Sequence, residues 1–123
     1  MAKTILIVDD STSLRVVVKI ALTRAGYDVI EAGDGKMALS ELDKAGKVNL
    51  IVSDVNMPNM DGIAFLTQVK QHLRHKFTPV IMLTTEGHEG KMAQARAAGA
   101  KAWLTKPFNP PQLLDAVSKL IQP

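Results

Sequence analysis

The amino-acid sequence predicts an α/β fold in which a parallel β-sheet is covered by helices on both faces. Short apolar runs typical of buried strands alternate about five times with segments of helical periodicity. Right-handed crossovers between parallel strands place the connecting helices on the two faces of the sheet. The chain has 123 residues and contains no linker or low-complexity tract, which predicts one domain over residues 1–123.

The expected strands are continuous apolar runs. Ile5, Leu6, Ile7 and Val8 follow one another without a polar residue, and residues 50–52 form a similar run. Apolar runs without alternation indicate strands that are covered on both faces. We expect strands at 4–8, 27–32, 50–54, 80–83 and 102–105.

The expected helices carry apolar residues three and four positions apart. The first follows N-cap candidates at 11–13 and ends at Gly26. Further helices are expected at 36–45, 62–74, 91–98 and 110–121, the last with a capping box between Asn109 and Gln112. The residues expected to face the sheet are Leu14, Val17, Val18, Ala21 and Leu22 in the first helix, and Phe65, Leu66, Val69 and Leu73 in the third.

Composition excludes several classes of function. The chain has no cysteine, so it has neither a disulfide framework nor a thiolate metal site. Residues 1–4 lead into a strand without a signal-peptide pattern, and no apolar run reaches the roughly 20 residues of a membrane span. The formal charge of +3 is mild and comes without a basic run, which argues against direct binding of nucleic acid. We expect a cytoplasmic monomer that does not associate with membranes.

Polar residues stand at the carboxyl ends of four expected strands. They are Asp9 and Asp10, Asp54, Thr84 and Lys106. These strand ends share one edge of a parallel sheet, so the side chains are expected to converge there. Taken singly, each residue has a simpler explanation: a helix cap for the acid pair, a strand former for Thr84 and a solvated surface lysine for Lys106.

Three neighbouring carboxylates require compensating positive charge. A like-charge pair 4 Å apart costs about 4 kcal/mol at an effective dielectric near 20. Lys106 supplies one positive charge. Hard oxygen ligands without His or Cys favour Mg²⁺, with Mn²⁺ as the alternative, as the source of the rest. Acids, a cation, a hydroxyl and a metal are the components of phosphoryl transfer, with Asp54 as the acceptor of the phosphoryl group.

These residues resemble the receiver domain of two-component response regulators, and more narrowly the stand-alone, CheY-like kind. The motifs that carry the resemblance are Ile7-Val8-Asp9-Asp10, the run from Ser53 through Asp54 to Gly62, Leu83-Thr84-Thr85 and Thr105-Lys106-Pro107-Phe108. They span essentially the whole chain. The resemblance implies a flavodoxin-like (βα)5 doubly wound sheet of strand order 2-1-3-4-5, and a cis bond between Lys106 and Pro107.

The resemblance also implies a role for each site residue. Asp54 takes a phosphoryl group from a histidine kinase. Asp9, Asp10, Asp54 and the carbonyl of Asn56 hold Mg²⁺, while Lys106 and Thr84 contact the phosphoryl group. Such a domain catalyses only its own phosphorylation and dephosphorylation, so it is not an enzyme with a separate substrate.

Three side chains near the site, Trp103, Asn56 and Glu86, each allow a functional and a structural explanation. Receivers usually carry Tyr or Phe three residues before the lysine, and this chain has Trp103 there. Trp103 is either a switch residue or an aromatic that lies at the surface or packs at the rim of the core. Asn56 and Glu86 lie two residues beyond Asp54 and Thr84. We hypothesise that they set the lifetime of the phosphoaspartate; the alternative is ordinary loop polarity.

Two rival functions have partial support. Residues 33–38 match the G-x-G-x-x-A dinucleotide fingerprint, although a turn with tight helix packing explains them more simply. A Mg²⁺-dependent aspartyl-phosphate phosphatase would need a second acid two residues after Asp54, and Asn56 stands there. The histidines, including His72 and His75, are expected at the surface or at helix caps.

The expected partners are proteins. A histidine kinase acts upstream, and a basic face around an aromatic residue suits an acidic or amphipathic helix downstream. By resemblance the target is a flagellar motor switch protein in chemotaxis, while a phosphate shuttle or a regulator of another target stays open. The partner face comprises Lys91, Arg96, Lys101, Trp103 and Lys119.

Overall fold

The computed structural model describes residues 2–85 and 89–121. Strands and helices alternate along the whole of this part of the chain, as the sequence predicts. The elements are β1 (Thr4–Val8), α1 (Thr12–Arg24), β2 (Asp28–Ala32), α2 (Gly35–Lys44), β3 (Leu50–Asp54), α3 (Gly62–Gln71), β4 (Val80–Thr85), α4 (Glu89–Ala98), β5 (Ala102–Lys106) and α5 (Pro110–Leu120).

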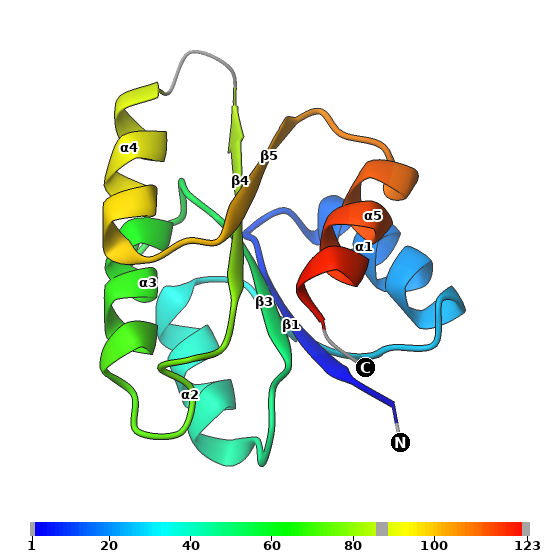
Figure 1. The fold of residues 1–123 in the computed structure, drawn as a ribbon, viewed down its shortest axis with the longest axis horizontal. Coiled ribbons are helices and arrows are strands. Elements are labelled where there is room, and N and C mark those ends of the chain that lie inside the picture. The colour runs from blue at the N-terminus through cyan, green and yellow to red at the C-terminus, as the bar shows by residue number, and fades with distance from the viewer. Residues whose placement is uncertain (1, 86–88, 122–123) are drawn as a thin grey trace.

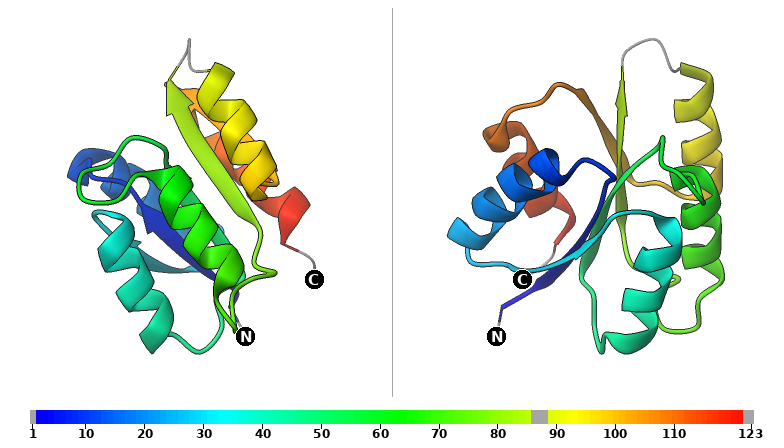
Figure 2. Two further views of the ribbon diagram at one scale, coloured as in Figure 1. Left: turned by 90° about the vertical axis from the view of Figure 1, so that its left-hand side faces the viewer. Right: turned by 180° about the vertical axis from the view of Figure 1, so that it is seen from behind.

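The strands form one parallel sheet in the order β2-β1-β3-β4-β5. Figures 1 and 2 show α1 and α5 on one face of this sheet and α2, α3 and α4 on the other. The flavodoxin-like doubly wound fold is therefore confirmed, together with its strand order and the cis bond between Lys106 and Pro107.

Each face of the sheet carries its own apolar core. Leu6, Val8 and Ile51 face α2, α3 and α4, whereas Ile5, Ile7 and Val52 face α1 and α5. Successive side chains of a strand point to opposite faces, so a strand covered on both sides needs apolar residues at every position. This explains the unbroken apolar runs. Among the described residues, no helix combines the length and the apolarity needed to cross a bilayer.

Two predictions of buried helix positions are wrong. Helix α3 ends at Gln71 instead of Arg74, His72 forms its C-cap, and the side chain of Leu73 is 88% exposed. In α1 the side chains of Val18 and Leu22 are buried, whereas Val17 is 53% exposed. Adjacent residues of a helix point in different directions, so Val17 faces solvent while Val18 faces the sheet. The first error extends the apolar stripe beyond the end of α3, and the second makes the stripe on α1 too wide.

The prediction that His75 lies at the surface is also wrong. Its side chain is 1% exposed, and its Nε2 lies 3.1 Å from the carbonyl oxygen of Leu42. Burial lowers the pKa of the imidazole, and the bond to Leu42 opposes this effect. The residue therefore ties the segment after α3 to the end of α2. His72, by contrast, does form a helix cap as expected.

Candidate functional site

The first part of the site is the turn between β1 and α1. The Asp9 carboxylate is buried, and its Oδ1 accepts a hydrogen bond from the Ser11 N–H at 2.8 Å. Ser11 in turn caps α1, accepting from the N–H of Leu14. Asp10 is exposed beside this turn. One acid is thus held in a fixed direction while the other faces solvent.

Asp54 is the last residue of β3, in the middle of the sheet. Its side chain is almost completely buried, with the residue 6% exposed. Burial and the nearby charge of Asp9 raise the pKa of the Asp54 carboxyl, and Lys106 acts in the opposite direction. A buried carboxylate with a raised pKa at a strand end is typical of a functional group and adds nothing to the packing of the core.

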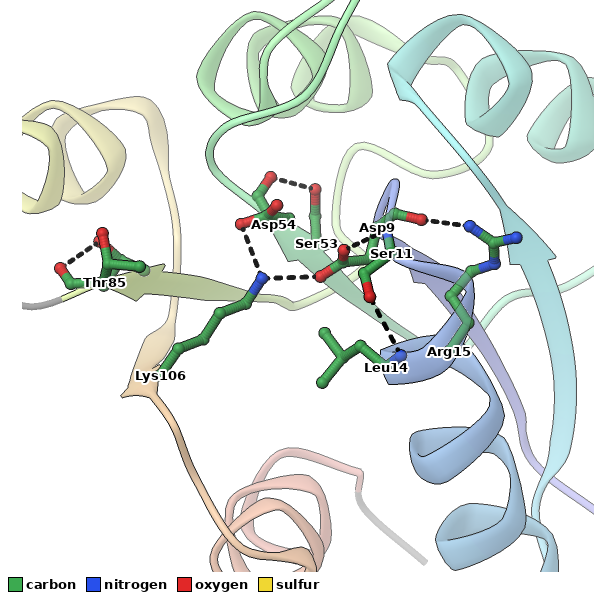
Figure 3. Close-up of polar contacts among 9 residues, drawn as sticks. Asp9, Ser11, Leu14, Arg15, Ser53, Asp54, Thr85 and Lys106 are labelled. Atoms are coloured by element: carbon green, nitrogen blue, oxygen red, sulfur yellow. Dashed lines mark hydrogen bonds and ion pairs between the residues drawn. The ribbon is translucent and has the colours of Figure 1, made fainter.

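Lys106 joins the two buried acids. Its Nζ lies 2.9 Å from Oδ2 of Asp9 and 3.2 Å from Oδ1 of Asp54 (Figure 3). Burial disfavours the ammonium, but the hydrogen bond to Asp9 and the charge of Asp54 outweigh it and raise the pKa of Lys106. Residues 97 positions apart in the sequence therefore form one ion cluster.

The acids of this cluster fit a divalent cation. Asp9, Asp10 and Asp54 each offer a carboxylate oxygen, and these atoms lie within 4.8 Å of one another. Lys106 balances only one of the three negative charges. Several carboxylates on a partly open edge match the oxygen ligands that Mg²⁺ prefers, with coordination positions left for water. Asn56 is exposed in the loop that follows Asp54.

Gly62, the first residue of α3, shapes this loop. A Cβ on Gly62 would lie 2.0 Å from the carbonyl oxygen of Asp54, far inside van der Waals contact. The N–H of Gly62 donates to the carbonyl of Val55 at 2.7 Å. The start of α3 therefore packs directly on the backbone that carries Asp54, at a distance that only glycine allows.

Arg15 is a site residue that the sequence did not reveal. Its Nη1 donates to the carbonyl oxygen of Asp9, and its Nε lies 3.3 Å from Oε1 of Glu31. Lys19 contacts the same glutamate at 3.4 Å. Arg15 thus ties the acidic turn to α1 and β2. In the sequence it is only a polar residue within a helical stretch, and no local signal distinguishes it.

The glycine-rich segment at 33–38 has a structural explanation. Asp34 caps α2 by accepting from the N–H of Met37 at 2.8 Å, and it also accepts from Asn59 at 2.8 Å. These bonds lower the pKa of Asp34. A Cβ on Gly35 would lie 2.9 Å from Met60. The predicted turn with tight packing is confirmed, with Met60 as the close neighbour, and the contact of Asp34 with Asn59 fixes the loop beyond Asp54.

The switch candidates lie on β4 and β5. Thr84 is buried, and its hydroxyl donates to the Thr85 carbonyl at 3.2 Å. Trp103 is half-buried, packs against the core beneath α4, and has the guanidinium of Arg96 4.5 Å from its ring centroid. Glu86 lies outside the described residues. Trp103 is therefore neither a fully exposed aromatic nor a fully buried one.

The expected partner face has two parts. Lys101 and Lys119 line a groove of about 480 Å³ between β5 and α5, and Lys119 also pairs with Asp115 at 2.9 Å. On the other side of β5, Arg96 covers Trp103, and Lys91 lies in the same helix as Arg96. The face is basic, but the side chains do not form a single cluster.

The sheet order, the acidic pocket and the bridging lysine define a receiver-type signalling domain. The chain belongs to the response regulator receiver domain family, which it matches over residues 5–118. It is 36% identical to the chemotaxis protein CheY1 of Helicobacter pylori over 118 residues, 95% of either chain.

Comparison with solved structures gives the same result. The chemotaxis response regulator CheY4 of Vibrio cholerae superposes with a TM-score of 0.91 at 44% identity, covering 98% of this chain and 99% of that one. The transcriptional regulatory protein PhoP of Bacillus subtilis is 37% identical over 122 residues, which are 50% of its length. Receiver domains of this family thus occur both at this length and as parts of longer regulators.

Proposed function

We propose that residues 1–123 act as a single-domain response regulator whose Asp54 is phosphorylated by a histidine kinase with Mg²⁺. The observation that carries the proposal is the contact of one ammonium, Lys106, with two buried carboxylates at the ends of β1 and β3. A structural ion pair would need only one acid. The surplus of negative charge at a solvent-accessible edge favours a site that receives a cation and a phosphoryl group.

Transfer proceeds by attack of an Asp54 carboxylate oxygen on the phosphorus of the donor. A new O–P bond forms, the P–N bond of the phosphohistidine breaks, and the leaving imidazole nitrogen takes the bonding electron pair and then a proton. Lys106, already beside Asp54, is positioned to hold one phosphoryl oxygen as the charge redistributes. The positive ammonium offsets the repulsion between the carboxylates and the negatively charged phosphoryl group.

The residues that would hold Mg²⁺ are Asp9, Asp10 and Asp54 together with the backbone carbonyl of Asn56. When bound, the metal supplies positive charge that stabilises the phosphoryl oxygens. Arg15 and the Ser11 N–H orient the Asp9 turn, so that its carboxylate need not reorganise during transfer. Burial and Asp9 raise the pKa of Asp54, and Lys106 opposes this rise and so favours the ionised carboxylate that attacks as nucleophile.

Access for the donor is provided beside the lysine. A hollow of about 400 Å³ is lined by Ser11, Leu14, Thr85, Lys106, Pro107 and Phe108. Its wall is largely apolar and Lys106 stands at one side, so an imidazole ring that carries a phosphoryl group fits its chemistry. Bound phosphate would then engage Thr84 and shift Trp103, which serves as the two-state element.

The downstream partner is a protein, and chemotaxis is the process that we favour. The proteins named CheY1 and CheY4, which this chain resembles over nearly their full lengths, are chemotaxis proteins. We propose a cytoplasmic monomer that binds a motor switch protein through Lys91, Arg96, Lys101, Trp103 and Lys119. The similarity to PhoP favours, as the second candidate, regulation of a target other than the motor.

Intact-mass spectrometry tests the phosphorylation. The chain is incubated with acetyl phosphate and Mg²⁺, and we expect the wild type to gain the mass of one phosphoryl group. Asp54→Asn should gain none, whereas the control Asp28→Asn, at the opposite end of the sheet, should behave as the wild type. Phosphorylation of Asp54→Asn to the wild-type extent would refute the assignment.

Swimming behaviour tests the choice of target. A deletion strain should lose steered swimming, and the wild-type gene, but not Asp54→Asn, should restore it. Normal chemotaxis in the deletion strain would favour the second candidate.

Autodephosphorylation rates of Asn56→Ala and Glu86→Ala test whether these residues control the lifetime of the phosphoaspartate. Unchanged rates in both variants would exclude this role.

A further inference from the structure

The edge of the sheet opposite Asp54 carries a second surface that phosphorylation does not require. It is built from the segment between α2 and β3 and the segment between α3 and β4, which Figures 1 and 2 place side by side. Between them lies a pocket of about 280 Å³. Its lining includes Lys47, Val48, Arg74 and Phe77.

Two large apolar side chains project from this edge. Leu73 is 88% exposed and Phe77 is 87% exposed, the highest values among the large hydrophobic side chains of the described residues. They stand four residues apart in a turn that is closed by the Lys76 N–H, which donates to the carbonyl of His72 at 3.0 Å. Leaving both in water costs hydrophobic free energy, so a surface that keeps them exposed is a candidate for contact with another molecule.

The turn is fixed from the inside. His75 is buried against the carbonyl of Leu42, and Arg74 Nη2 donates to the carbonyls of Leu42 at 3.2 Å and Asp43 at 2.7 Å. The hydroxyl of Thr78 donates to the carbonyl of Val48 at 3.3 Å. The apolar side chains are therefore presented on a segment with little freedom left to lose when a partner binds.

The charge around the apolar pair is positive. Residues 43–48 and 72–79 contain four cations, Lys44, Lys47, Arg74 and Lys76, against one carboxylate, Asp43. That carboxylate is itself 3.0 Å from the ring nitrogen Nε2 of His72. Lys44 also pairs with Glu41 of α2 at 3.6 Å, so Lys47, Arg74 and Lys76 carry the positive charge of this surface. Lys47 and Arg74 both line the pocket, and Lys76 lies 5.3 Å from the ring centroid of Phe77.

We propose that this amino-edge surface, formed by Leu73, Phe77, Lys47, Arg74 and Lys76, is a docking site for an acidic segment of another protein. An aromatic or aliphatic side chain of that segment packs against Phe77 and Leu73, while its carboxylates pair with Lys47, Arg74 and Lys76. The pocket is concave, which suits an inserted side chain better than a flat bilayer, and two apolar side chains are few for stable insertion into lipid. The site operates whether or not Asp54 is phosphorylated, and thus acts as a tether separate from the switch.

The test is a selection of random peptides displayed on phage. Peptides are first depleted on the double variant Leu73→Ser/Phe77→Ser and then selected on the wild-type chain. We expect the enriched peptides to carry net negative charge and a large apolar residue. Their binding should weaken about tenfold or more in Lys47→Glu/Lys76→Glu and fall with added salt. All four substituted side chains are exposed, so both double variants should remain folded, which circular dichroism checks.

Matched controls separate this site from the others. Val17→Ser removes an exposed apolar side chain from α1, and Asp54→Asn removes the phosphoacceptor, and both should bind the selected peptides as the wild type does. Three results would overturn the proposal: no enrichment, enrichment of neutral or basic peptides, or equal binding to the double variant. Cosedimentation with phosphatidylglycerol vesicles that depends on Phe77 would assign the surface to lipid instead. A dimer in sedimentation velocity that depends on Phe77 would assign it to a second copy of this chain.

Discussion

The sheet has an amino edge, where its parallel strands begin, and a carboxyl edge, where they end. Buried polar groups are stabilised in different ways at these two edges. At the amino edge, His75 and Thr78 are each bonded to a main-chain carbonyl, which satisfies them without any net charge. At the carboxyl edge, Asp9 and Asp54 are buried together and share a single cation, Lys106. The first arrangement holds two loops together. The second keeps like charges close despite their repulsion, and such an arrangement is retained when chemistry requires it.

The largest difference between the edges should come from their glycines. Gly62→Ala places a methyl group against the backbone of Asp54 and should cost about 3 kcal/mol or more of unfolding free energy. Gly46→Ala, at the amino edge, meets no atom within 4 Å and should be nearly neutral. Urea unfolding of both variants measures this. Equal stability of the two alanine variants would contradict the close approach of α3 to Asp54.

Magnesium should stabilise the folded chain by binding at the carboxyl edge alone. A ligand that binds the folded chain at a hundred times its Kd adds about 2.7 kcal/mol, so saturating Mg²⁺ should raise the melting temperature of the wild type. Asp10→Asn removes the negative charge of one carboxylate ligand and should reduce this rise substantially. Asp28→Asn, an exposed acid at the start of β2, should leave it unchanged. A rise that is the same in all three proteins would place the metal elsewhere.

Acid should weaken the amino edge through His75. Burial lowers the pKa of this imidazole below its ordinary 6.5, so the unfolded chain takes up a proton at higher pH than the folded chain. The contribution of His75 is thus complete above 6.5 and falls as the pH drops below it, by at most about 1.4 kcal/mol per pH unit. His72 and Arg74 also lower the pKa of this ring, and Asp43 raises it, but burial is the largest cause.

His75→Gln provides the comparison for this effect. Glutamine can still donate to the Leu42 carbonyl but does not titrate, so the unfolding free energy should depend less on pH than in the wild type. Urea unfolding at about pH 7.5 and about pH 5.5 measures the difference. Parallel losses in both proteins would show that another group carries the pH dependence.

The smallest effect is expected at the aromatic ring of Trp103. Arg96→Ala removes the guanidinium that lies over this ring and should cost about 0.5–1 kcal/mol, the usual value of a surface cation–π contact. The emission of Trp103, the only tryptophan, should change in the same variant. Arg24→Ala on α1 serves as the control, and an identical emission spectrum in Arg96→Ala and the wild type would exclude the contact in solution.

The sequence predicts the convergence at the carboxyl edge because that depends only on topology. Once the strands are parallel, residues that follow them, such as Asp9, Asp54 and Lys106, share one edge whatever the details of packing. The contacts of Arg15 and the approach of Gly62 to Asp54 depend on the paths of loops and side chains, which no local pattern specifies. Leu73 shows the same limit, since its helical spacing continues past the residue at which α3 ends.

Trapping of the acyl phosphate with borohydride tests the central assignment most directly. Borohydride reduces an aspartyl phosphate to homoserine, which peptide mass spectrometry assigns to one position. After reaction with acetyl phosphate and Mg²⁺, we predict homoserine at position 54 alone. Homoserine at position 9 or 10, or none in a chain that intact mass shows to be phosphorylated, would contradict Asp54 as the acceptor.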